Sequence, residues 1–212
     1  MENYTKYRWF FTSSGTLVIG GKNALQNDEL LFNIKNQKAD YIIMHTSEPG
    51  SPFCILYAPA SKISKSDIAE AAIFTGCFSR AWKLGKMSAK VDIFNSSQIH
   101  KNKDMNSGTW GVYGEVQRTN VPLSLVFTKQ KNILRAVPEK TFEKSISEEK
   151  GKKPVSVSMV KITPGNIEKD HMFAKLELEL DDTLSEEQVL SAIPAGKFKI
   201  QREVINITNG KN

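Results

Sequence analysis

The chain has 212 residues, enough to bury a core as one large domain or as a domain with an appendage. Hydrophobic residues make up 40% and charged residues 25%, which excludes a disordered or fibrous protein. No apolar run approaches the roughly 20 residues that cross a bilayer, and Met1–Phe11 lacks the plan of a signal peptide. We expect a cytoplasmic protein without a membrane partner.

Charge is segregated along the chain. The formal net charge is +6 and the pI about 9.2. Arg80–Lys153 holds fifteen basic and seven acidic residues, a balance of +8, whereas Asn166–Leu190 holds two basic and eight acidic residues, a balance of −6. The basic middle predicts attraction for a polyanion, and the acidic section predicts repulsion.

The N-terminal quarter predicts a hairpin followed by a helix. Two β-rich runs, Tyr7–Thr12 and Thr16–Ile19, flank the turn sequence Ser-Ser-Gly. Ala24–Asn36 has helical periodicity, with Asn23 as N-cap and Gln26 at the third helical position. This spacing predicts a capping box.

The middle of the chain predicts strands around one long helix. Three runs are typical of strands: Asp40–Thr46, Phe53–Ala58 and Ser88–Ser96. Apolar residues recur every three to four positions in Ser66–Lys83, which predicts a single helix. Gly108–Thr128 predicts two or three strands with a turn at Arg118–Asn120.

The polar segment Lys144–Lys153 predicts a linker or exposed loop. We therefore divide the chain into a domain over residues 1–143 and a C-terminal α+β section over 154–208. In this section we expect a strand, a helix, a helix with a Ser185/Gln188 capping box and a final strand, in the segments 154–165, 166–180, 184–193 and 196–207. The predicted fold class is α+β or α/β, a mixed β-sheet with packed helices.

Little in the sequence indicates a cofactor or metal. Cys54 and Cys77 lie in apolar runs and suit buried, reduced thiols. No Cys or His pair shows ligand spacing. The chain carries neither a Walker P-loop nor a G-x-G-x-x-G fingerprint, so we expect no nucleotide cofactor.

The junction between the second strand and the first helix is the strongest candidate site. Two glycines allow a sharp turn and a close approach by a ligand, and the helix start offers free N–H groups with a partial positive charge. A lysine and carboxamides suit phosphate and sugar hydroxyls. The candidate residues are Gly20, Gly21, Lys22, Asn23, Gln26 and Asn27. A tight turn with a simple helix cap is the alternative.

These residues also resemble a family. The blocks RWFFTSSGTLVIGGKNALQNDEL, DYIIMHT, PGSPF, EAAIFTGCFSRAW and SGTWGVYGEVQRTNVPLSLVF are similar to the NFACT-R domain, in the same order, over about Tyr7–Val137. The segments VKITPGNIEKD and LSAIPAGKFKI are similar to the piece that follows this domain in archaeal members. Matching positions are Gly20, Gly21, Lys22, Asn23, Asn27, His45, Ser79 and Trp82.

The resemblance implies RNA binding. NFACT proteins act on tRNA and the large ribosomal subunit in ribosome-associated quality control, and their R domain is regarded as an RNA-binding module. Lys22 replaces the family's usual arginine and loses its bidentate phosphate geometry. The chain has no room for the family's N-terminal glycosylase-like domain, helix-hairpin-helix unit and coiled coil, so we do not expect it to elongate nascent chains by itself.

Several further side chains are candidates for RNA contact. His45 ends a buried strand and could face a ligand, although a lone histidine there is more often structural. Trp82 lies on the apolar stripe of its helix, so Trp110 is the better candidate for stacking on a base. The basic candidates for phosphate contact are Arg80, Lys83, Lys86, Lys90, Lys101 and Lys103.

Three functions remain open. The favoured one is a non-catalytic protein that binds structured tRNA or rRNA, because phosphate-binding groups are abundant while no nucleophile, metal set or acid/base pair stands out. The second is an enzyme or component of RNA modification that uses His45. The third is a protein-interaction module that uses the acidic C-terminal section.

Overall fold

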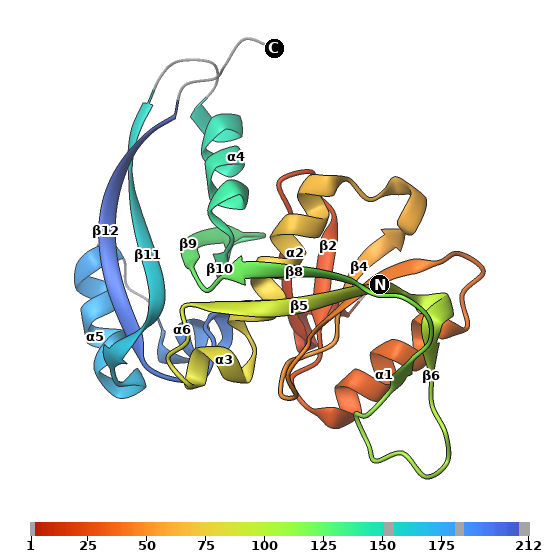
Figure 1. Cartoon of the computed structure of the whole chain (residues 1–212). Helices are drawn as coiled ribbons and strands as arrows, with labels where there is room; N and C mark the ends of the chain where they lie inside the picture. Colours follow the sequence, from red (N-terminus) through yellow and green to blue (C-terminus); the bar gives the residue numbers. More distant parts are fainter. Residues whose placement is uncertain (1–2, 151–154, 181–184, 208–212) are drawn as a thin grey trace.

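Six antiparallel strands form the larger sheet (Figure 1). The computed structural model describes residues 3–150, 155–180 and 185–207. The spatial order of the sheet is β1 (Arg8–Phe11), β2 (Leu17–Gly20), β4 (Cys54–Pro59), β3 (Tyr41–Thr46), β5 (Ser88–Asn95) and β8 (Gln117–Pro122). A two-stranded ribbon follows β5 in the chain, made of β6 (Ile99–His100) and β7 (Gly111–Val112).

A second antiparallel sheet lies beside the first (Figure 1). Its order is β10 (Ile133–Val137), β9 (Leu125–Gln130), β11 (Val155–Ile167) and β12 (Phe198–Ile207). The sheet thus joins strands from both sides of the boundary that the sequence suggests. The division into domains at residues 143 and 154 stays a prediction.

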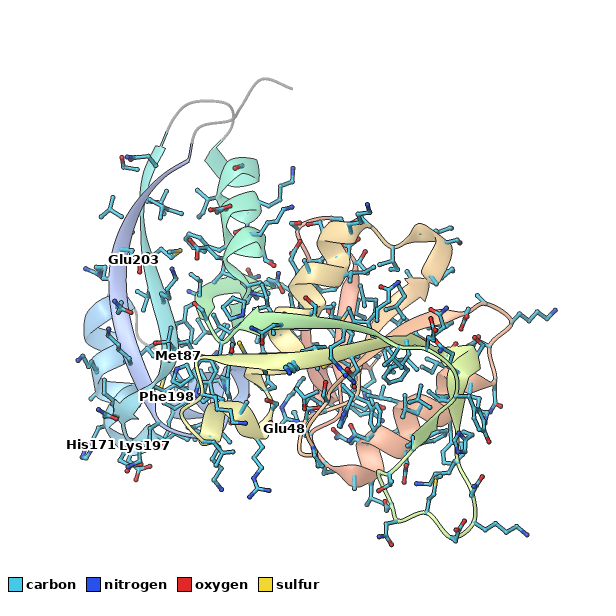
Figure 2. The ribbon with its side chains drawn as sticks, in the orientation of Figure 1. Glu48, Met87, His171, Lys197, Phe198 and Glu203 are labelled. Carbon is cyan, nitrogen blue, oxygen red and sulfur yellow. The ribbon has the colours of Figure 1, made fainter. Side chains whose placement is uncertain are left out.

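Helices cover the two sheets. They are α1 (Ala24–Lys35), α2 (Lys65–Cys77), α3 (Arg80–Lys83), α4 (Glu139–Lys150), α5 (Lys169–Leu180) and α6 (Glu186–Ala192). One core cluster packs α1 on one face of the larger sheet, and another packs α2 on its opposite face. A third cluster joins α3, α5, α6 and the second sheet, with Trp82 against Phe198, which is labelled in Figure 2. Short 3₁₀ turns lie at Tyr4–Lys6, Ala60–Lys62 and Ser96–Gln98.

The predicted α+β class is confirmed, and most elements fall where the sequence patterns place them. The N-terminal hairpin pairs Arg8 with Gly20 and Phe11 with Leu17. The helix predicted within residues 166–180 is present as α5, and Ser185 and Gln188 form the expected capping box. Cys54 and Cys77 are free and buried. None of the helices in the described residues is long and apolar enough to span a bilayer.

The single helix predicted over Ser66–Lys83 is wrong, because it breaks into α2 and α3. Ser79 adopts an extended backbone, donates its hydroxyl to the Gly76 carbonyl and accepts the N–H of Ala81. The N–H of Arg80 donates to the Gly50 carbonyl in the loop after β3. Ser79 is thus the N-cap of a new helix, whose first N–H bonds a loop instead of the preceding turn.

Two loop predictions are also wrong. Arg118–Asn120 is no turn but part of β8, where Arg118 forms an ion pair with Asp92 on the neighbouring β5. Residues 144–150 of the predicted linker belong to α4, while 151–153 lie outside the described residues. The helix docks because Phe142 is buried and Thr141 donates its hydroxyl to the carboxylate of Glu70 on α2.

Replacing Ser79 with alanine should destabilise the fold by about 1–2 kcal/mol, because a buried helix cap is lost. Chemical denaturation of the two proteins measures this difference. Ser147→Ala is the matched control, since that hydroxyl only donates to a carbonyl within α4. Equal midpoints for Ser79→Ala and the unmodified protein would show that the cap contributes nothing.

Candidate nucleic-acid interface

The predicted site residues gather at one end of the larger sheet, which we call the loop end. At this end β2 and β3 finish and β1, β4 and β5 begin. The register pairs Gly20 with both Arg8 and Cys54, and it pairs Thr46 with Val91. Three segments therefore meet in space: the end of β2 at Gly20, the end of β3 after His45, and the break before Arg80. Sixty residues separate Gly20 from Arg80 in the sequence.

The glycines of the junction are required by close packing. A Cβ at Gly20 would lie 2.8 Å from the sulfur of Cys54. A Cβ at Gly21 would overlap the side-chain oxygen of Asn27 and lie 2.8 Å from its backbone nitrogen. Both glycines are buried, whereas residues 22–25 are exposed. The helix start therefore faces solvent, with the glycines packed beneath it.

The carboxamides of the junction hold the backbone. Asn23 caps α1 by accepting the N–H of Gln26 at 2.9 Å. Gln26 accepts the N–H of Lys22 at 2.9 Å instead of that of Asn23, so the capping box predicted at this helix start is not formed. Asn27 accepts the N–H of Phe53 at 3.3 Å and so ties α1 to the start of β4. Their oxygens are thus engaged within the chain.

Lys22 lies beside two arginines that the sequence analysis did not single out. Arg8 donates to the Gly21 carbonyl, and its guanidinium lies 5.5 Å from the centre of the Phe78 ring. Burial lowers the pKa of Lys22, and the charges of Arg8 and Arg135 lower it further. Arg8 and Lys22 line a cleft of about 610 Å³ whose opposite wall is α6. We call it the cation cleft.

A signal for these arginines exists in the sequence. Arg135 interrupts the apolar strand β10 and Arg8 opens the apolar strand β1. A charge within an otherwise buried strand is costly, so it marks a site that is paired or functional. The sequence does not show that strands 127 residues apart bring the two together.

A second hollow, of about 270 Å³, lies on the other side of the loop after β3. It is lined by Arg80, Lys86 and Lys90, together with Ser79 and Asn120. Lys86 forms an exposed ion pair with Glu48, which Figure 2 labels at this end of the sheet. Arg80, Lys83 and Lys90 are exposed, and no ion pair in the described residues involves them.

His45 lines a third hollow, of about 390 Å³, with Phe53, Asp92 and Trp110. Its ring packs against Phe53 with centroids 4.5 Å apart. The Nδ1–H of His45 donates to the Thr46 carbonyl at 2.7 Å, so Nε2 is the acceptor in the neutral ring. Burial lowers the pKa of His45, against smaller opposing effects of Thr46 and Asp92.

Two candidate residues, Trp110 and Lys101, form contacts within the protein. Trp110, which we expect from the sequence to be exposed for stacking, is only 7% exposed and donates its indole N–H to Asp28 at 2.7 Å. Lys101 is held by Asp28 and by the carbonyls of Asn106 and Thr109. Together they fasten the loop after β6 to α1. Lys103 is exposed in that loop.

Comparison with known proteins then identifies the family. A family model described as the NFACT protein RNA binding domain matches residues 6–114, just over half of the chain. The chain belongs to this family. The match includes the glycine junction, His45, the α2–α3 break and the loop that carries Lys101 and Lys103, whereas Asn120 and α6 lie outside it.

Similarity extends beyond this domain. The archaeal Rqc2 homolog aRqcH of Methanocaldococcus jannaschii is 27% identical over 210 residues, which cover 94% of this chain and 29% of that protein. The chain thus spans less than a third of this relative's length. The C-terminal part of the fibronectin/fibrinogen-binding protein from Streptococcus suis matches 54% of this chain and 44% of that chain at 23% identity, with a TM-score of 0.48.

His45 should titrate below the ordinary histidine value of 6.5. Because the unfolded chain then binds more protons than the NFACT fold, this residue's contribution to stability is complete above pH 6.5 and declines as the pH falls toward the folded pKa. NMR titration of the imidazole measures the midpoint, and His45→Gln should flatten the pH dependence of unfolding in this window. A midpoint at or above 6.5 would contradict the burial effect.

Proposed function

We propose that this NFACT-R protein binds structured RNA, a tRNA or ribosomal RNA, through the loop end of its larger sheet, in ribosome-associated quality control or translation. The observation that carries the proposal is the ring of exposed cations around this end: Lys22, Arg80, Lys83 and Lys90. Such side chains contact phosphates without reading sequence. Similarity to an Rqc2 homolog supports the ribosomal setting.

The three hollows offer different groups to an RNA. The hollow at Arg80 offers positive charge to the RNA backbone, and the cation cleft offers positive charge to a single phosphate. The hollow at His45 offers a neutral nitrogen acceptor next to the ring of Phe53, which suits a sugar hydroxyl or the edge of a base. Recognition then depends on the shape of a folded RNA that spans these hollows, more than on its sequence.

Affinity for tRNA should fall steeply with salt, because each neutralised phosphate releases counterions. With three to five phosphate contacts, binding at 200 mM salt should be about 40- to 500-fold weaker than at 50 mM. Fluorescence anisotropy with labelled tRNA at several salt concentrations gives the slope. Affinity that does not change with salt over this range would contradict binding through the cations of the loop end.

Lys22→Glu should weaken tRNA binding at least about 10-fold, because it removes one contact and repels the phosphate that made it. The melting temperature should change little, since Lys22 is exposed and only its backbone N–H bonds the chain. Lys62→Glu is the matched control: this exposed lysine lies after β4, at the opposite end of the sheet. An equal loss of tRNA affinity in both variants would show that the loop end is not the binding surface.

A further inference from the structure

Arg135 is a buried cation, and none of the ion pairs among the described residues involves it. Arg135 lies on β10 and is only 6% exposed. Its guanidinium lies 4.7 Å from the centre of a Trp9 ring. It donates from Nε to the Leu134 carbonyl and from Nη2 to the hydroxyl of Ser191 on α6. Burial lowers its pKa to about 10. An uncompensated buried charge of this kind is costly to the fold.

Two further cations, Arg8 and Lys22, belong to the same region as Arg135. Arg8 and Arg135 both lower the pKa of Lys22, and burial also lowers the pKa of Arg8. Among the described residues, none of the ion pairs involves Arg8, Lys22 or Arg135. Lys22 is thus repelled by both arginines, and Arg8 and Lys22 line a cleft with room for a nucleotide, in which the lining residue Ser191 holds Arg135. An anion of matching charge would stabilise all three.

The far wall of the cation cleft limits which anion fits. The first turn of α6 places Glu186 and Glu187 on this wall, followed by Leu190, Ser191 and Ile193. A continuous sugar-phosphate chain crossing the cleft would bring successive phosphates against those carboxylates. A single phosphate at the end of a chain can enter toward the cations without passing them.

We propose that the cation cleft binds a phosphomonoester, the terminal phosphate of an RNA or nucleotide, through Arg8, Lys22 and Arg135. The charge supports this class, because a phosphomonoester carries about two negative charges near neutral pH while a backbone diester carries one. Ser191 holds the Arg135 guanidinium from α6, so the C-terminal section completes the site. The inference rests on RNA binding at the loop end and adds a preference for chain ends.

Binding of matched oligonucleotides tests the proposal. A short single-stranded RNA with a 5′-phosphate, the same RNA with a 3′-phosphate and the unphosphorylated RNA are compared by anisotropy. We expect one phosphorylated form to bind about 10-fold more tightly than the unphosphorylated RNA, and we expect Lys22→Gln to abolish the difference while Lys62→Gln keeps it. Equal affinity of all three RNAs excludes an RNA end as the ligand, and together with no effect of phosphate or AMP on thermal unfolding it overturns the proposal. Salt-dependent tRNA binding would still stand.

Thermal unfolding of the full chain gives an independent readout. Inorganic phosphate or AMP at ten times its Kd should raise the melting temperature by about 3–6 °C, whereas adenosine should not. Stabilisation by AMP without a preference among the RNAs assigns the phosphomonoester to a free nucleotide. Arg135→Met should abolish the phosphate effect without lowering the melting temperature of the free protein. A destabilised variant that keeps the full phosphate effect shows Arg135 to be purely structural and overturns the proposal.

Discussion

The loop end depends on the contact between Gly21 and Asn27. The absence of a Cβ at Gly21 lets the Asn27 carboxamide lie against the backbone, where its oxygen accepts the N–H of Phe53. This one side chain thereby joins the end of β2, the first turn of α1 and the start of β4. Any larger residue at position 21 would separate the three elements and displace Lys22 from its two arginines.

Because the carboxamide oxygens are used within the chain, the RNA contact proposed at the junction rests mainly on charge. Asn23 and Gln26 bond backbone N–H groups, which leaves Lys22 as the exposed cation there. A lysine is a flexible point charge and does not impose the planar geometry of an arginine. Here Arg8 lines the cleft together with Lys22, and Arg135 bonds Ser191 on the facing α6.

The sequence predicts the parts of this architecture that depend on local pattern. The hairpin, α1 and the buried strands follow from periodicity and capping residues, and the family follows from short motifs. The break at Ser79 could not be predicted in this way, because the Gly50 carbonyl that bonds Arg80 lies thirty residues away. The burial of Trp110 and the pairing of Lys101 could not be predicted for a similar reason, since the carboxylate of Asp28 that bonds both belongs to a helix more than seventy residues earlier.

The hydrogen bond from Arg135 to Ser191 makes the C-terminal section part of the site. The guanidinium comes from β10, the hydroxyl that orients it comes from α6, and the neighbouring Arg8 and Lys22 come from the N-terminal hairpin and its junction. The core cluster beneath them joins Trp82 of α3 to Phe198 of β12 and to α6. A displacement of α6 would therefore release Arg135 and open the acidic wall of the cleft. At the proposed interface, affinity for RNA would then be linked to the docking of a segment outside the matched RNA-binding domain.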